Sequence, residues 1–99
     1  MFFTEGLAYT TKNGKYGYIE KDGNTVIDYQ YTSAGNFKNG LAPVKLNGKW
    51  GYIDKIGKMV IETDYDKINE FSDGLAKVEK NKKIAFINTK GEVVLGNID

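Results

Sequence analysis

The chain lacks several residue types on which catalytic and nucleic-acid-binding sites depend. It contains no cysteine and no histidine. Ser–His and Cys–His nucleophile pairs therefore cannot form, and zinc sites, which favour these ligands, are nearly excluded. All 14 basic residues are lysines, so the bidentate guanidinium fork that reads guanine edges and phosphates is missing. We expect no nucleic-acid partner, no metal and no other cofactor.

Long hydrophobic runs are missing too. The longest uninterrupted apolar run, from Ile84 to Ile87, is far too short to span a bilayer. The N-terminus has neither the basic nor the apolar region of a signal peptide. With 40% hydrophobic residues, 27% charged residues and a net charge of +1, the 99 residues fit one soluble domain, residues 1–99. The sequence leaves the cellular compartment open.

What the chain does contain is an internal repeat. The block Asn-Gly-Lys-Trp-Gly-Tyr-Ile-Asp at 47–54 follows a close copy at 13–20 and precedes a degenerate copy at 81–88. Nearly half of the aligned positions are identical between the first two copies, and each copy opens with Phe-x-x-Gly-Leu-Ala. Such self-similarity at a fixed period indicates a repeat architecture. The copies span residues 3–36, 37–70 and 71–99.

The contents of each copy favour strands over helices, although tetratricopeptide helix pairs repeat with a similar period. The first two copies carry five and four glycines, and each glycine inside a helix costs about 1 kcal/mol relative to alanine. Asn47-Gly48 is a strong hairpin signal because both turn residues must take positive φ. In the second copy we predict strands at 41–46, 49–54 and 58–62. The link at 63–70 is left as either a helical turn or a fourth short strand.

The third copy diverges from the other two. Lys82 replaces the turn glycine, Ile84 the aromatic residue and Ala85 the middle glycine. Terminal repeats of stacked arrays are usually modified in this way. The sequence therefore predicts an all-β fold, a short solenoid-like array of stacked β-hairpin or three-stranded units, with two full repeats and a divergent C-terminal cap. We also expect the lysine cluster of this copy to protect an open strand edge. Its members are Lys77, Lys80, Lys82 and Lys83.

Residues 37–66 resemble the WG (KWG) repeat of bacterial proteins. They combine Phe-x-x-Gly-Leu-Ala, Asn-Gly-Lys-Trp-Gly-Tyr-Ile-Asp-Lys, Gly-x-x-Val-Ile and a Tyr-Asp pair. The first copy departs from the pattern with Tyr16 in place of the tryptophan, and the third departs at Ile84 and Ala85. The resemblance implies β-rich tandem modules that mediate binding, and it carries no catalytic residue.

Two groups of carboxylates resemble a glycosidase site and a calcium site, but each lacks a feature that such a site requires. Glu20 and Asp54 share a repeat column, but Asn88 occupies it in the third copy, so we expect a turn-facing polar position rather than a glycosidase acid. Glu62, Asp64 and Asp66 alternate along the chain, but they lack the glycine and distal glutamate of an EF-hand loop. We expect no enzyme activity.

The aromatic columns are the best candidates for a ligand or partner surface. They consist of Tyr16, Tyr18, Trp50 and Tyr52. Exposed, such rows form platforms for sugar rings or for the apolar anchors of a protein partner. Buried, they fill the space between repeats, and we favour burial for Trp50 because a chain this small has few other large core residues.

We therefore expect a non-enzymatic repeat module that binds protein. The alternatives are a carbohydrate-binding module for cell-wall glycans, which requires an exposed aromatic row, and a structural spacer without a ligand. Because stacking needs about three repeats, self-association or a longer parent array is also expected.

Overall fold

The computed structural model describes residues 2–98, and the expected domain ends Met1 and Asp99 lie outside the described residues. This part of the chain contains strands and turns and no helix. The strands are β1 (Leu7–Lys12), β2 (Lys15–Glu20), β3 (Thr25–Tyr31), β4 (Ser33–Ala34), β5 (Ala42–Leu46), β6 (Lys49–Ile53), β7 (Met59–Tyr65), β8 (Lys67–Ile68), β9 (Leu75–Lys80), β10 (Lys83–Asn88) and β11 (Val93–Gly96).

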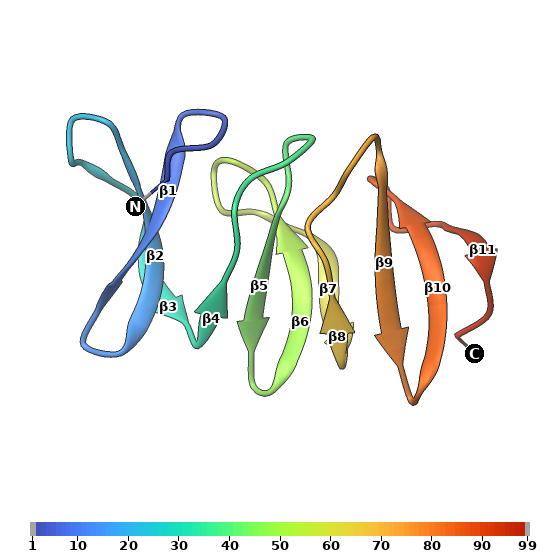
Figure 1. Ribbon diagram of the computed structural model, residues 1–99. Coiled ribbons are helices and arrows are strands. Elements are labelled where there is room, and N and C mark those ends of the chain that lie inside the picture. The colour runs from blue at the N-terminus through green and yellow to red at the C-terminus, as the bar shows by residue number, and fades with distance from the viewer. Residues whose placement is uncertain (1, 99) are drawn as a thin grey trace.

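Three small antiparallel sheets stand in a row, which confirms the all-β tandem array (Figure 1). The first unit is the sheet β1-β2-β3, the second is β4-β5-β6-β7 and the third is β8-β9-β10-β11, so that each unit follows the previous one along the chain. The molecule measures 41 × 27 × 20 Å, and the two ends of the chain lie at opposite ends of the row.

The hairpin turn that the sequence predicted has the expected geometry. Asn47 and Gly48 take φ values of 51° and 81°, and Asn13 and Gly14 repeat them at 53° and 79°. In the third unit the second turn position is Lys82, at φ 68°. A lysine in this left-handed region is strained because its Cβ crowds the following carbonyl.

A further two-residue turn escaped the sequence analysis. Glu5-Gly6, Asn39-Gly40 and Asp73-Gly74 all take positive φ. In the second unit Lys38 and Leu41 exchange backbone hydrogen bonds across this turn, at 2.9 and 3.0 Å. The Asn-Gly and Asp-Gly dipeptides were the available signal.

The third strand of the second unit is longer than predicted. It runs from Met59 to Tyr65 rather than ending at Glu62, because the inward alternation of Ile61 and Tyr65 continues past an irregularity in the pairing with β6. The remainder of the link holds β8, the fourth short strand that we left open. This strand pairs with β9 of the next copy and so belongs to the sheet of the third unit.

The predicted lysine-guarded edge is also corrected. The lysine cluster lies on β9, on β10 and in the turn between them, whereas the edges of that sheet are β8 and β11. Lys80 instead reaches back to the preceding unit, where its Nζ lies 2.6 Å from Oδ2 of Asp64.

The middle glycine of the first two hairpins, Gly17 or Gly51, allows two strands to come close. A Cβ built on Gly51 would lie 2.4 Å from the carbonyl oxygen of Ile61, a distance that side chains do not tolerate. In the third unit the arrangement is reversed, since Ala85 pairs with Gly96. A Cβ on Gly96 would lie 2.5 Å from the carbonyl oxygen of Ile84. Each of these strand pairs therefore keeps one glycine, and the side that carries it can change.

The hydrophobic core is divided into two clusters, each shared between neighbouring units. We call them the first core and the second core. The first core combines Leu7, Tyr18, Ile27 and Tyr31 of the first unit with Phe37, Ala42, Val44 and Ile53 of the second. The second core combines Leu41, Tyr52, Ile61 and Tyr65 of the second unit with Phe71, Ala76, Val78, Ala85 and Ile87 of the third. In each core the earlier unit supplies what we call the trailing half-core, and the later unit supplies the leading half-core.

Candidate interaction surface

Two of the four aromatic candidates are corrected by the structure. Tyr18 and Tyr52 have no exposed surface, so they are not part of any binding surface. Burial was open in the sequence because it depends on the next unit, which covers both rings. The Tyr52 ring packs edge-on against Phe71 with centroids 4.7 Å apart, and its hydroxyl donates a 2.6 Å hydrogen bond to the carbonyl oxygen of Asn69.

Tyr18 repeats this arrangement one unit earlier. Its ring lies 4.9 Å from that of Phe37, and its hydroxyl donates to the carbonyl oxygen of Gly35 at 2.7 Å. Burial raises the pKa of both hydroxyls well above the ordinary tyrosine value. The second aromatic of each hairpin is therefore a structural tether between units.

Tyr16 and Trp50 are partly exposed. Trp50 packs against the second core, and Nζ of Lys45 lies 6.0 Å from its ring centroid. The Tyr16 ring is tilted against Tyr9 at 5.8 Å. Both rings thus have neighbours that restrict access to them, and a ligand at either one stays a prediction.

Two of the three acidic residues considered for calcium pair with lysines. Asp64 bonds Lys80 and Asp66 bonds Lys49. The hydrogen bond from Lys49, helped by the amide of Asn81, lowers the pKa of the Asp66 carboxyl. Among residues 2–98 no three His, Cys, Asp or Glu side chains are grouped so that they could hold a metal ion.

The column of Glu20, Asp54 and Asn88 faces a turn, as expected. Oδ1 of Asp54 accepts hydrogen bonds from the amides of Ile56 at 3.1 Å and Lys58 at 2.9 Å. Oδ1 of Asn88 accepts the two equivalent bonds, both at 3.0 Å. These oxygens hold their own turns, which is a structural role that aspartate and asparagine fill equally.

Comparison of the three copies separates structural positions from the rest. Nine positions carry the same residue in all three copies. Four are the core residues represented in the second copy by Phe37, Leu41, Ala42 and Ile53. Three are the turn residues represented there by Gly40, Asn47 and Gly57. The last two are a lysine and a valine, Lys49 and Val60 in the second copy.

The valine column has no structural role that we can identify in the described chain. Lys49 bonds Asp66 of its own unit, whereas the valines point away from both cores. Val26, Val60 and Val94 are 41%, 41% and 56% exposed. The residues two positions further along, Asp28, Glu62 and Gly96, differ from copy to copy.

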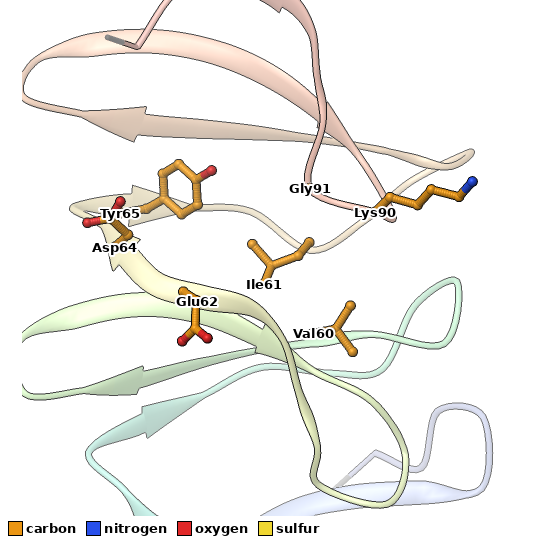
Figure 2. Close-up of a pocket in the computed structure, with 7 residues that line it drawn as sticks. All are labelled: Val60, Ile61, Glu62, Asp64, Tyr65, Lys90 and Gly91. Carbon is orange, nitrogen blue, oxygen red and sulfur yellow. The ribbon is translucent and has the colours of Figure 1, made fainter.

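A shallow depression of about 230 Å³ adjoins Val60 (Figure 2). Ile61 lies in its middle, with the acidic side chains of Glu62 and Asp64 toward one side and Lys90 toward the other. Its volume is below the roughly 300–1,000 Å³ of small-molecule pockets. The depression combines aliphatic and charged neighbours, and its volume suits one side chain rather than a whole small molecule.

The aromatic columns do not point to this surface. The available signal was the valine that all three copies share at a strand position adjacent to the inward-facing Ile27 and Ile61. In a strand, successive side chains point to opposite faces, so one member of each Val-Ile or Val-Leu pair had to face outward.

Residues 16–50 and 50–83, which together make up more than half of the chain, match the family model of the WG containing repeat. The comparisons with curated proteins and with solved structures return no match. No helix in residues 2–98 has the length and apolar character needed to cross a membrane.

Proposed function

We propose, from the premise that this chain belongs to the WG-repeat family, that it is a non-enzymatic module that binds a protein partner along the exposed valine column. The observation that carries the proposal is the valine shared by all three copies at an exposed position (Val26, Val60 and Val94). Core packing and turn geometry account for the shared phenylalanine, leucine, alanine, isoleucine, glycine and asparagine positions. They do not account for a valine that faces water.

The depression beside Val60 favours a protein segment over a small molecule. It is shallow, and it places the aliphatic side chains of Val60 and Ile61 beside charged side chains of both signs. A partner side chain such as leucine, flanked by charged residues, fits these properties. A partner that contacts successive valines would bind more tightly than one that contacts a single valine, because each further contact is effectively intramolecular.

The glycan alternative has less support. A sugar platform needs an open ring face, and of the four aromatic candidates only Tyr16 and Trp50 reach the surface.

Peptides selected from a random library on the immobilised protein provide the test, with affinity measured by calorimetry. We expect Val60→Asp to weaken binding about tenfold or more, the loss of about 1.4 kcal/mol that one buried aliphatic contact supplies. Ile84→Asp is the matched control, since Ile84 is also an exposed aliphatic strand residue, and it should bind as the unmodified protein does.

A selected peptide whose affinity ignores Val60→Asp would contradict the proposed surface. Trp50 fluorescence distinguishes the glycan alternative. An emission shift on adding oligosaccharides, lost in Tyr16→Ala, would favour a sugar-binding module instead.

A further inference from the structure

The third unit exposes a trailing half-core. The residues that supply this half in the second unit are Leu41, Tyr52 and Ile61. Their counterparts are Leu75, Phe86 and Leu95, which we call the tail face. Leu75 and Leu95 are 41% and 66% exposed, whereas Leu41 and Ile61 are both 5% exposed. The tail face belongs to the last unit of the row, and no further unit of residues 2–98 lies beyond it (Figure 1).

The first unit exposes the complementary leading half-core. Its counterparts to Phe37, Val44 and Ile53 are Phe3, Thr10 and Ile19, which we call the head face. Phe3 is 37% exposed where Phe37 is fully buried, and Thr10 and Ile19 are partly exposed. The head face therefore corresponds to the leading half of the first and second cores, and the tail face corresponds to their trailing half.

The head and tail faces also carry a donor and an acceptor equivalent to those that form hydrogen bonds between units. Oε1 of Glu5 accepts the amide of Gly40 at 2.9 Å, and Oδ1 of Asn39 accepts the amide of Gly74 at 2.9 Å. The next carboxylate in this column is Asp73, beside the tail face. The preceding amide is that of Gly6, beside the head face.

The ion pair between units extends this pattern. Nζ of Lys55 lies 3.6 Å from Oε1 of Glu5. In the repeat register Glu5 corresponds to Asp73, and Lys55 corresponds to Lys21. The tail thus carries an acid where the head carries a base, so a head-to-tail contact pairs opposite charges, whereas head-to-head or tail-to-tail contacts would bring like charges together.

The turns that contain Gly23, Gly57 and Gly91 also indicate that the head and tail faces are complementary. A Cβ on Gly57 would lie 3.3 Å from Cγ2 of Ile27, and one on Gly91 would lie 3.2 Å from Cγ1 of Ile61, so each turn rests on the isoleucine of the preceding unit. The equivalent turn at Gly23 has open space above it. Leu95, the equivalent of the two isoleucines, is exposed.

We propose that the head face of one chain docks on the tail face of a second copy of the same chain, forming a third core of the same construction. The contact joins two different surfaces, so each dimer keeps one free head and one free tail to which further copies can add. Phe86 replaces the tethering tyrosine and cannot donate its hydrogen bond. The contact between chains is therefore weaker than the contacts within one.

Two blocking variants test the arrangement by sedimentation velocity. We expect the unmodified protein to associate increasingly as its concentration rises, and both Phe3→Asp and Leu95→Asp to sediment as monomers. An equimolar mixture of the two variants retains one head and one tail, and it should form dimers and nothing larger. Ile56→Asp is the control for an added exposed charge, because the first copy carries Asp22 at this turn position, and it should associate normally.

Carbodiimide crosslinking with peptide mapping tests the register. It should join Asp73 of one chain to Lys21 of another, and Glu5 to Lys55 within one chain as the internal control. Mapping at high and low protein concentration separates the two, since only the first should fade on dilution.

Three outcomes would overturn the proposal. They are a monomeric unmodified protein up to about 1 mM, a mixture that stays monomeric, and a single blocking variant that still dimerises, which would indicate a symmetric contact. The proposal does not depend on the valine column. Phe3→Asp and Leu95→Asp should leave peptide binding unchanged, and Val60→Asp should leave association unchanged.

Discussion

At the scale of single residues, the close approach at Gly51 shows how one hydrogen atom in place of a methyl group sets the local geometry. The third unit achieves the same approach with the glycine moved to the opposite strand, at Gly96. The third copy carries Ala85 in place of the middle glycine, and the glycine on the neighbouring strand β11 compensates for this change.

This exchange predicts the effect of alanine at Gly51. Gly51→Ala should lower the free energy of unfolding by about 1–3 kcal/mol, because its methyl group meets backbone atoms that must shift. Adding Glu62→Gly, which recreates the pairing of Ala85 with Gly96, should restore part of that loss. Urea unfolding followed by circular dichroism measures both.

The reverse substitution is the control. Ala85→Gly should cost only about 0.5–1 kcal/mol, the ordinary entropy penalty of glycine. If Gly51→Ala were as mild as this control, the close approach would have no energetic weight.

The sequence predicted residue burial only in part. The period-two rule placed Trp50 and Tyr52 on one face of a strand, and both do contact the second core. It did not distinguish the partly exposed Trp50 from the fully buried Tyr52. That difference comes from Phe71, which belongs to the next copy of the repeat and is brought over Tyr52 by the stacking of the units.

At the scale of elements, turns were the most predictable feature. Asn13, Asn47 and Asn81 all take positive φ in the expected hairpins, because the requirement is local to the turn itself. The short strands β4 and β8 were harder to predict. Each is two residues long and is defined by pairing with a strand of the following copy of the repeat, which no local pattern encodes.

The hairpin between β9 and β10 has a strained backbone position, because Lys82 takes a positive φ. Lys82→Gly should raise the free energy of unfolding by about 0.5–1 kcal/mol, because relief of the left-handed strain exceeds the entropy that glycine loses on folding. Gly48→Lys in the second hairpin is the matched reverse substitution and should destabilise. A lower melting temperature for Lys82→Gly would show that the lysine side chain contributes more than its backbone costs.

At the scale of the whole molecule, four buried tyrosines predict sensitivity to alkaline pH. Burial is the largest cause of the raised pKa of each hydroxyl, at Tyr18, Tyr31, Tyr52 and Tyr65. Above about pH 10, the ordinary tyrosine pKa, the unfolded chain releases protons that the folded chain retains. The tyrosines' contribution is therefore fully present below that pH, and stability falls as pH rises beyond it.

Urea unfolding at a series of values between about pH 8 and pH 11 measures this decline. Tyr52→Phe should reduce the slope and also lower stability at neutral pH by about 1 kcal/mol, the net value of its lost hydrogen bond to Asn69. A stability that stays constant up to pH 11 would contradict the assignment of these hydroxyls to a desolvated core.

The sharing of each core between neighbours also limits how such a chain can change during evolution. An isolated unit has two half-cores and no complete one, so a gene for a single copy would encode a chain with little to hold it folded. Duplication of one repeat-length segment instead adds a unit and a finished core together, without new packing to be selected. Lineages carrying this architecture should therefore gain or lose length in whole repeats, and partial repeats should be confined to the ends of the array.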